Sequence, residues 1–182
     1  MNIRKSTLNV CITGIGIALF VTLSMCLRVP VFENYYLCLG YIVTTLWLYS
    51  VGIFSGSIVC IFGTILYCFL INGLRGLPGW TFGNIFIVVF VGLSIMYSKN
   101  LKHTFSKYLA IISGIISGCF LGIFIAKSIV EHLLYSQPVV IRMANNIYAM
   151  IADIVVLLFS IPICFYIDKI ITKHNLLLKG TK

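Results

Sequence analysis

Acidic residues are almost missing from this chain of 182 residues. It has 4 Asp and Glu against 13 Lys and Arg, and charged residues make up only 9% of the composition. Because charged residues are about 25% of an ordinary soluble domain, the sequence excludes that class. The formal net charge of +9 does not indicate nucleic-acid binding, because the cations lie in short segments between long apolar blocks.

Motifs for catalysis and metal binding are missing as well. The 7 cysteines are scattered, without a Cys-x-x-Cys pair or a His–Cys cluster at ligand spacing, which argues against a metal or redox site. His132 follows Glu131, but no nucleophile stands at a recognisable spacing. The glycine-rich segment 73–79 lacks the Lys-Ser/Thr pair of a phosphate-binding loop. We therefore expect no enzyme activity, no catalytic residues, no metal and no cofactor.

Hydrophobic length is what the sequence does contain, since 60% of its residues are hydrophobic. A bilayer core of about 30 Å is crossed by roughly 20 apolar residues. The apolar run 37–70 is too long for one span, and the segment 50–56, which contains Gly52 and Gly56, supplies a break. The pattern predicts an all-α integral membrane protein, with one six-helix domain over 1–182. The expected spans are 8–27, 35–50, 51–71, 81–97, 108–126 and 144–167.

The positions of Lys and Arg predict how these spans are oriented. Basic residues gather before the first span, between the fourth and fifth, and after the last: Arg4, Lys5, Lys99, Lys102, Lys107, Lys169, Lys173, Lys179 and Lys182. The other connections hold only Arg28, Arg75, Lys127 and Arg142. Because cytoplasmic loops of membrane proteins accumulate Lys and Arg, both termini are expected in the cytoplasm.

Two small residues lie four positions apart on the first expected helix, Gly14 and Ala18. This spacing lets two helix backbones approach closely. Packing within the bundle is the commoner use of such a pair, and docking of another membrane protein is the second. The spacing alone leaves both open.

Polar residues inside the last expected span are candidates for function. Asp153 lies near its middle, where a carboxylate is either a functional group or a hydrogen-bonded tie between helices. Arg142, Asn145 and Asn146 cluster at its outer mouth. Amides can bond the edge of a heterocycle and Arg can hold a carboxylate. An interfacial anchor and a helix cap are the structural alternatives.

Four short motifs occur in order along the chain. They are Gly14-Ile15-Gly16-Ile17-Ala18-Leu19, Asn34-Tyr35-Tyr36-Leu37-Cys38-Leu39-Gly40, the turn with Gly52 and Gly56, and Asn145-Asn146-Ile147-Tyr148. With its size and six expected spans, the chain resembles the S component, the vitamin-binding subunit, of energy-coupling factor (ECF) transporters. The resemblance covers nearly the whole chain, and it does not identify the vitamin.

The resemblance implies a multi-pass protein of a bacterial cell membrane that captures a vitamin or related heterocycle. Gly14 and Ala18 would dock on the transmembrane coupling subunit, and two partner ATPases would hydrolyse ATP. The ligand would lie among Arg75, Trp80, Asn84, Arg142, Asn145 and Asn146. The alternatives are a stand-alone proton-coupled permease that uses Asp153 and a regulatory membrane subunit without a ligand.

Overall fold

The computed structural model describes residues 3–26, 30–32, 35–72 and 76–179. Nearly all of them are helical, apart from a short antiparallel hairpin near the N-terminus. The elements are α1 (Ile3–Cys26), β1 (Pro30–Phe32), β2 (Tyr35–Tyr36), α2 (Gly40–Ser50), α3 (Ile53–Tyr67), the π-helical η1 (Cys68–Asn72), α4 (Leu77–Lys99), α5 (Thr104–Cys119), the π-helical η2 (Phe120–Lys127), α6 (Ser128–Tyr135) and α7 (Val139–Lys179).

Five helical segments are long and apolar enough to cross a membrane: Thr7–Cys26, Ile53–Ile71, Leu77–Lys99, Thr104–Tyr135 and Val139–Ile167. The expectation of a helical membrane protein is confirmed at this level. In place of a sixth long helix stands α2, whose 11 residues give roughly 16 Å of helix at 1.5 Å per residue. This length is short of the hydrocarbon core, so the six-span count stays a prediction.

The expected break after residue 50 is present between α2 and α3. Gly52 has φ +130°, a backbone conformation that residues with a side chain rarely adopt. A Cβ atom on Gly56 would lie 2.7 Å from the backbone nitrogen of Leu48. These two glycines therefore let α2 and α3 meet in a tight turn and pack against each other.

The fifth helix is longer than the sequence indicated. It continues through η2 and α6 to Tyr135, where the expected span ended at residue 126. Ser136 then takes a left-handed conformation with φ 52° and ends the helix. The last helix also extends beyond its expected limits, from Val139 to Lys179. The connection between α6 and α7 is therefore a short turn, and Lys127 belongs to a helix.

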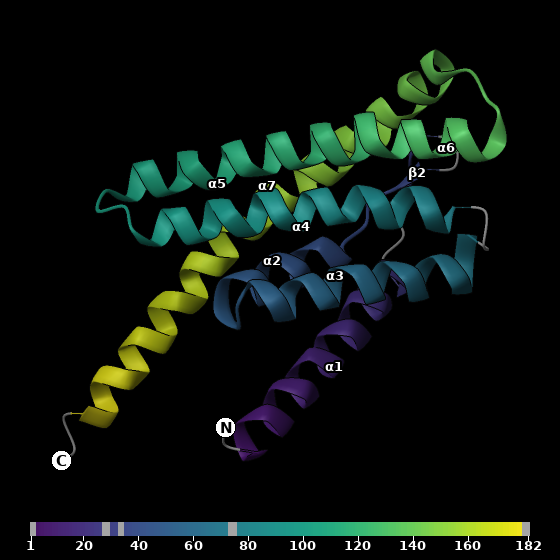
Figure 1. Cartoon of the computed structure of the whole chain (residues 1–182). Coiled ribbons are helices and arrows are strands. Elements are labelled where there is room, and N and C mark those ends of the chain that lie inside the picture. Colours follow the sequence, from purple (N-terminus) through teal and green to yellow (C-terminus); the bar gives the residue numbers. More distant parts are fainter. Residues whose placement is uncertain (1–2, 27–29, 33–34, 73–75, 180–182) are drawn as a thin grey trace.

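Figure 1 shows α4 and α5 side by side and antiparallel, with α2 and α3 on one side of them and α1 beyond α3. Gly114, Gly118 and Gly122 line the contact. A Cβ atom on Gly118 would lie 3.2 Å from the Cα of Ile87, and one on Gly122 would collide with the carbonyl oxygen of Gly83. Glycines spaced by four residues therefore bring these two helices together, as expected for membrane helices.

The helix α1 is held at the edge of the bundle by α2 and α3. The indole of Trp47 donates a hydrogen bond of 3.1 Å to the carbonyl oxygen of Ile12. A Cβ atom on Gly16 would lie 2.6 Å from Val59 and 2.7 Å from Trp47. Because Gly16 has no side chain, α1 can lie close to both neighbours.

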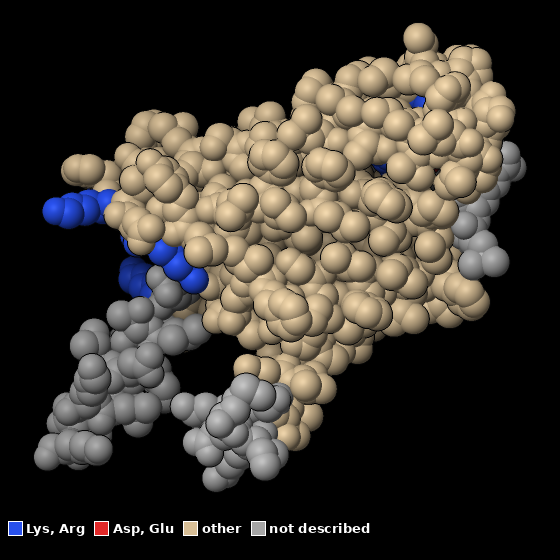
Figure 2. Space-filling view, in the orientation of Figure 1, with Lys and Arg blue, Asp and Glu red and all other residues tan. Residues whose placement is uncertain are grey.

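Lysines gather at the end of the molecule where α4 turns into α5. Lys99 and Lys102 are exposed there and Lys107 is partly exposed, and Figure 2 shows the blue side chains at this end. The face drawn shows no acidic side chain among the described residues. Figure 1 places the start of α1 and the end of α7 toward the same end. This arrangement fits the positive-inside pattern.

A cysteine introduced at Gln137, beside the α6–α7 turn, should react with a membrane-impermeant maleimide added to intact cells. One introduced at Asn100, in the α4–α5 turn, should react only after permeabilisation, because the lysine-rich end is expected inside. The unmodified chain, with its native cysteines, gives the background labelling. The reverse accessibility of the two positions would contradict the proposed orientation.

Candidate functional site

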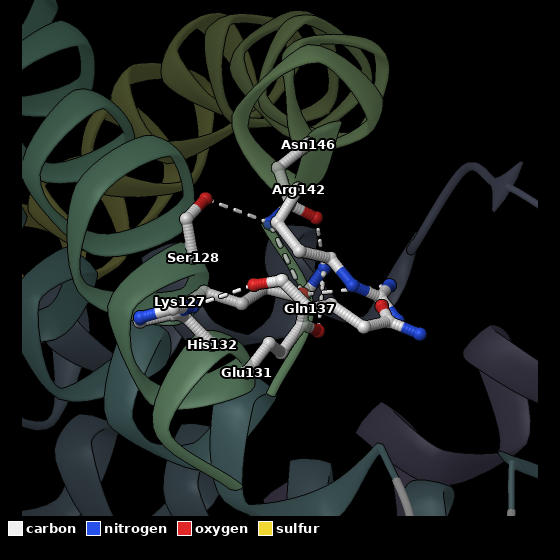
Figure 3. A network of polar contacts seen from close by, with 7 residues as sticks. All are labelled: Lys127, Ser128, Glu131, His132, Gln137, Arg142 and Asn146. Carbon is white, nitrogen blue, oxygen red and sulfur yellow. Dashed lines mark hydrogen bonds and ion pairs between the residues drawn. The ribbon is translucent and has the colours of Figure 1, made fainter. Parts of the chain in front are cut away.

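A network of buried polar side chains lies at the opposite end of the molecule. Lys127 ends η2, Ser128 and Glu131 begin α6, and Arg142 and Asn146 come from the first turns of α7. Figure 3 shows these side chains turned toward one another across the gap between the two helices. The exposed fraction is 2% for Lys127, 7% for Glu131 and 0% for Asn146. These groups are therefore withdrawn from solvent and depend on one another for hydrogen bonds.

Asn146 is at the centre of the network. Its Oδ1 accepts a hydrogen bond of 2.5 Å from Lys127 Nζ. Its Nδ2 donates to Ser128 Oγ at 2.9 Å and to Glu131 Oε2 at 3.3 Å. One amide thus supplies an acceptor to the lysine and uses both of its N–H groups. Asn146 joins α7 to both η2 and α6.

Glu131 lies between the two cations of the network. Its Oε1 is 3.5 Å from Lys127 Nζ, and its Oε2 is 3.7 Å from Nη1 of Arg142. A buried charge is expensive unless it is paired, and Lys127 and Glu131 are paired one helical turn apart. The described cluster still holds two cations and one carboxylate. This leaves an excess of positive charge at the site.

The first turn of α4 closes the network on a third side. Lys127 Nζ lies 4.0 Å from the ring centroid of Trp80, a distance at which a cation is attracted to an indole face. A Cβ atom on Gly79 would lie 3.1 Å from Glu131 Cγ and 3.2 Å from Lys127 Cγ. Because Gly79 has no side chain, α4 approaches closely and Trp80 reaches the lysine.

The structure brings together three of the six residues expected at the ligand site, namely Trp80, Arg142 and Asn146. Asn84 lies one turn further along α4 and belongs to a second group. Asn145 is exposed, unlike its fully buried neighbour Asn146. Arg75 lies outside the described residues. The six residues therefore do not form one cluster in the described part of the chain.

Lys127, Ser128 and Glu131 were missed as site residues. The lysine interrupts an apolar run, so hydropathy indicated the end of a span and a place in the outer connection. The available signal was the spacing of Lys127 and Glu131, because opposite charges four residues apart face each other on a helix. Because Glu131 compensates the charge of Lys127, the helix can continue past the lysine.

The second polar group lies deeper in the bundle. Tyr41 Oη donates to Asn84 Oδ1 at 2.7 Å, and Asn84 Nδ2 donates to Thr64 Oγ1 at 2.9 Å. Asp153 is 1% exposed. Its Oδ2 has no hydrogen-bond partner among the described residues. The bonds of Asn84 thus join α2, α3 and α4, and Asp153 lies midway along the candidate span Val139–Ile167.

A third feature lies on the exposed surface of α1, the side that faces away from the bundle. Gly14, Ala18, Thr22 and Cys26 are all exposed and follow one another at intervals of four; we call them the small-residue face. A Cβ atom on Gly14 would meet no other described atom within 4 Å, in contrast to Gly16 two residues later. The sequence left two roles open for this pair, packing within the bundle and docking of another protein. In the described chain, Gly14 does not pack within the bundle.

No family model matches this chain, and neither a curated protein nor a solved structure has a significant match to it. The functional argument therefore rests on the three features just described: the polar network around Asn146, the deeper group at Asp153 and the small-residue face.

The two neighbouring asparagines offer a matched test of the network. Asn146→Ala should destabilise the protein by about 1–3 kcal/mol, because Lys127 and Ser128 lose buried hydrogen bonds. Asn145→Ala removes an exposed amide and should change stability little. The apparent unfolding temperature of each variant in mild detergent measures the difference, and equal effects would mean that the network does not stabilise the fold.

Proposed function

We propose that this chain is the substrate-binding subunit of an ECF-type importer in a bacterial cell membrane. It would bind a vitamin-like small molecule at its outer end and deliver it by docking on a transmembrane coupling subunit. Partner ATPases would supply the energy. The observation that carries the proposal is the exposed small-residue face of α1.

This face is chemically unusual for a surface that only meets lipid. Neighbouring positions on α1 expose large apolar side chains, such as Val10 and Ile15, which suit contact with acyl chains. Gly14 and Ala18 offer little side-chain area to lipid. They allow another helix to approach the backbone closely, and such packing drives association in membranes.

The two sides of α1 support a division of roles. Gly16 turns toward α2 and α3, where its lack of a side chain lets Trp47 and Val59 pack. Gly14 and Ala18 turn away from the bundle and are exposed. One set of small residues thus serves the fold, and the other is available to a partner subunit.

The polar network around Asn146 supports the binding role. Convergent polar groups beside an aromatic ring are typical of small-molecule sites, and here Lys127, Arg142 and Asn146 converge beside Trp80. None of them is on α1, where the small-residue face lies. Ligand capture and docking would therefore depend on different residues, as a subunit that binds first and docks later requires. The lysines at the α4–α5 turn support a six-span arrangement with both termini inside.

Gly14→Leu and Ala18→Leu should each abolish uptake in cells that contain the coupling subunit and ATPases. A leucine on a close-contact face holds two helices apart. The purified variants should keep the wild-type unfolding temperature, and the variant chain should no longer copurify with the coupling subunit.

Gly16→Leu is the matched control for an effect on the fold. Its side chain would collide with Val59 and Trp47, so this variant should lose stability as well as uptake. Unfolding temperatures in mild detergent separate the two outcomes. Destabilisation by Gly14→Leu as severe as that by Gly16→Leu would refute the assignment of the small-residue face to docking.

A proton-coupled permease is the second candidate function, and a specific observation favours it. Asp153 is buried midway along the candidate span Val139–Ile167, and one of its carboxyl oxygens lacks a hydrogen-bond partner among the described residues. Ionisable groups at such depth are common in proton pathways. A carboxyl group that only ties helices together would not need to change its protonation during transport.

Asp153→Asn separates the two functions because it keeps the size of the side chain and removes the titrating group. For an ECF-type subunit, uptake should keep its pH dependence and should require the ATPase partners. A permease would transport without these partners and would lose pH-dependent uptake in the variant. Uptake of labelled substrate across a range of pH, with and without the partners, distinguishes the two cases.

A further inference from the structure

The charge balance of the polar network around Asn146 restricts the chemistry of a ligand that binds there. Glu131 is shared between Lys127 and Arg142, so one carboxylate faces two cations. Lys127 is in addition bonded to Asn146 and lies over the ring of Trp80, whereas Arg142 has only its ion pair with Glu131 among the described residues. Arg142 is therefore the cation with less compensation.

The geometry of Arg142 leaves part of its guanidinium unused. Its Nη1 is 3.7 Å from Glu131 Oε2, which is an ion pair but is too long for a hydrogen bond. Its Nε is buried and has no hydrogen-bond partner among the described residues. The Nε–Nη2 edge of a guanidinium is a fork that holds a carboxylate through two parallel hydrogen bonds. The side chain is 22% exposed, so the group lies at the border of the site.

The other polar groups of the network are already engaged. Lys127 contacts Asn146, Glu131 and the ring of Trp80. Both N–H groups of Asn146 are used by Ser128 and Glu131. A neutral heterocycle that needed these donors would have to break bonds inside the network. An anion at Arg142 would instead add bonds and balance a charge.

We propose that the ligand of this site carries a carboxylate, which binds the Nε–Nη2 edge of Arg142. This inference rests on the proposed function, because it concerns the small molecule that the subunit captures. The carboxylate would reach this edge from the exposed part of the Arg142 side chain.

Matched acids and neutral analogues test the proposal. The protein is placed in nanodiscs of phosphatidylcholine, so that no anionic lipid competes. Binding is measured for biotin and biotin amide, nicotinate and nicotinamide, and pantothenate and panthenol. The small molecules that copurify with the protein are identified by mass spectrometry. One acid should bind about ten- to a hundredfold more tightly than its neutral analogue, the value of a charge-assisted hydrogen bond, or the copurified ligand should be a carboxylate.

Variants test whether the preference for the acid over its neutral analogue depends on Arg142. Binding of the identified acid and of its neutral analogue is measured for each variant. Arg142→Gln should bind the acid and the amide within about threefold of each other, since the charge and the fork are both lost. Arg142→Lys keeps the charge without the fork, so it should recover only part of the preference. Lys102→Gln removes a cation at the opposite end and should leave the preference unchanged. Unfolding temperatures confirm that the variants are folded.

Each remaining outcome counts against a defined claim. Equal binding of acid and amide to the wild-type protein, or a preference that survives in Arg142→Gln, would overturn the carboxylate proposal and leave the proposed function intact. A copurified ligand without a carboxylate would do the same. Absence of binding by all six probes, together with no copurified small molecule, would overturn both.

Discussion

The burial of one lysine determines much of this structure. Lys127 is 2% exposed, and an unpaired ammonium at that depth would cost several kcal/mol. Its charge is balanced by Glu131 one turn later, and its hydrogens are directed to Asn146 and the face of Trp80. These partners come from α6, α7 and α4. A single buried cation therefore fixes the relative positions of three helices at this end of the molecule.

This requirement also explains why the fifth helix continues to Tyr135. A lysine that found its partner in solvent could end the membrane segment. Here the partner is Glu131, and the i,i+4 spacing is preserved only if the backbone remains helical through both residues. The continuous helix presents Lys127 and Glu131 to α7, where Asn146 accepts a hydrogen bond from the lysine and donates one to the glutamate. Arg142, one turn before Asn146, pairs through Nη1 with Glu131 Oε2. The Nε of Arg142 has no hydrogen-bond partner among the described residues.

The sequence predicted the coarse fold because its signals are local. Apolar length, glycine at the α2–α3 turn and the glycines spaced by four on α5 and η2 each act within one or two helices, and the structure contains these features. The length of α2 and the extension of the fifth helix through η2 and α6 to Tyr135 were not predictable from hydropathy. The extension depends on a charge pair that cancels the effect of a lysine. The same reason divides the expected site: Trp80, Arg142 and Asn146 meet, whereas Asn84 pairs with Tyr41 because α2 and α4 bring them together.

The side of a helix on which a small residue lies decides its role, and the sequence cannot give that side for a helix with few polar residues. Gly14 and Gly16 differ by two positions, about 200° around a helix with 3.6 residues per turn. Trp47 settles the orientation of α1, because its indole bonds the carbonyl of Ile12 and its ring occupies the space over Gly16. Gly14 and Ala18 must then face outward. An anchor formed by α2 thus exposes the small-residue face of α1, and the fold and the proposed docking surface have a common physical origin.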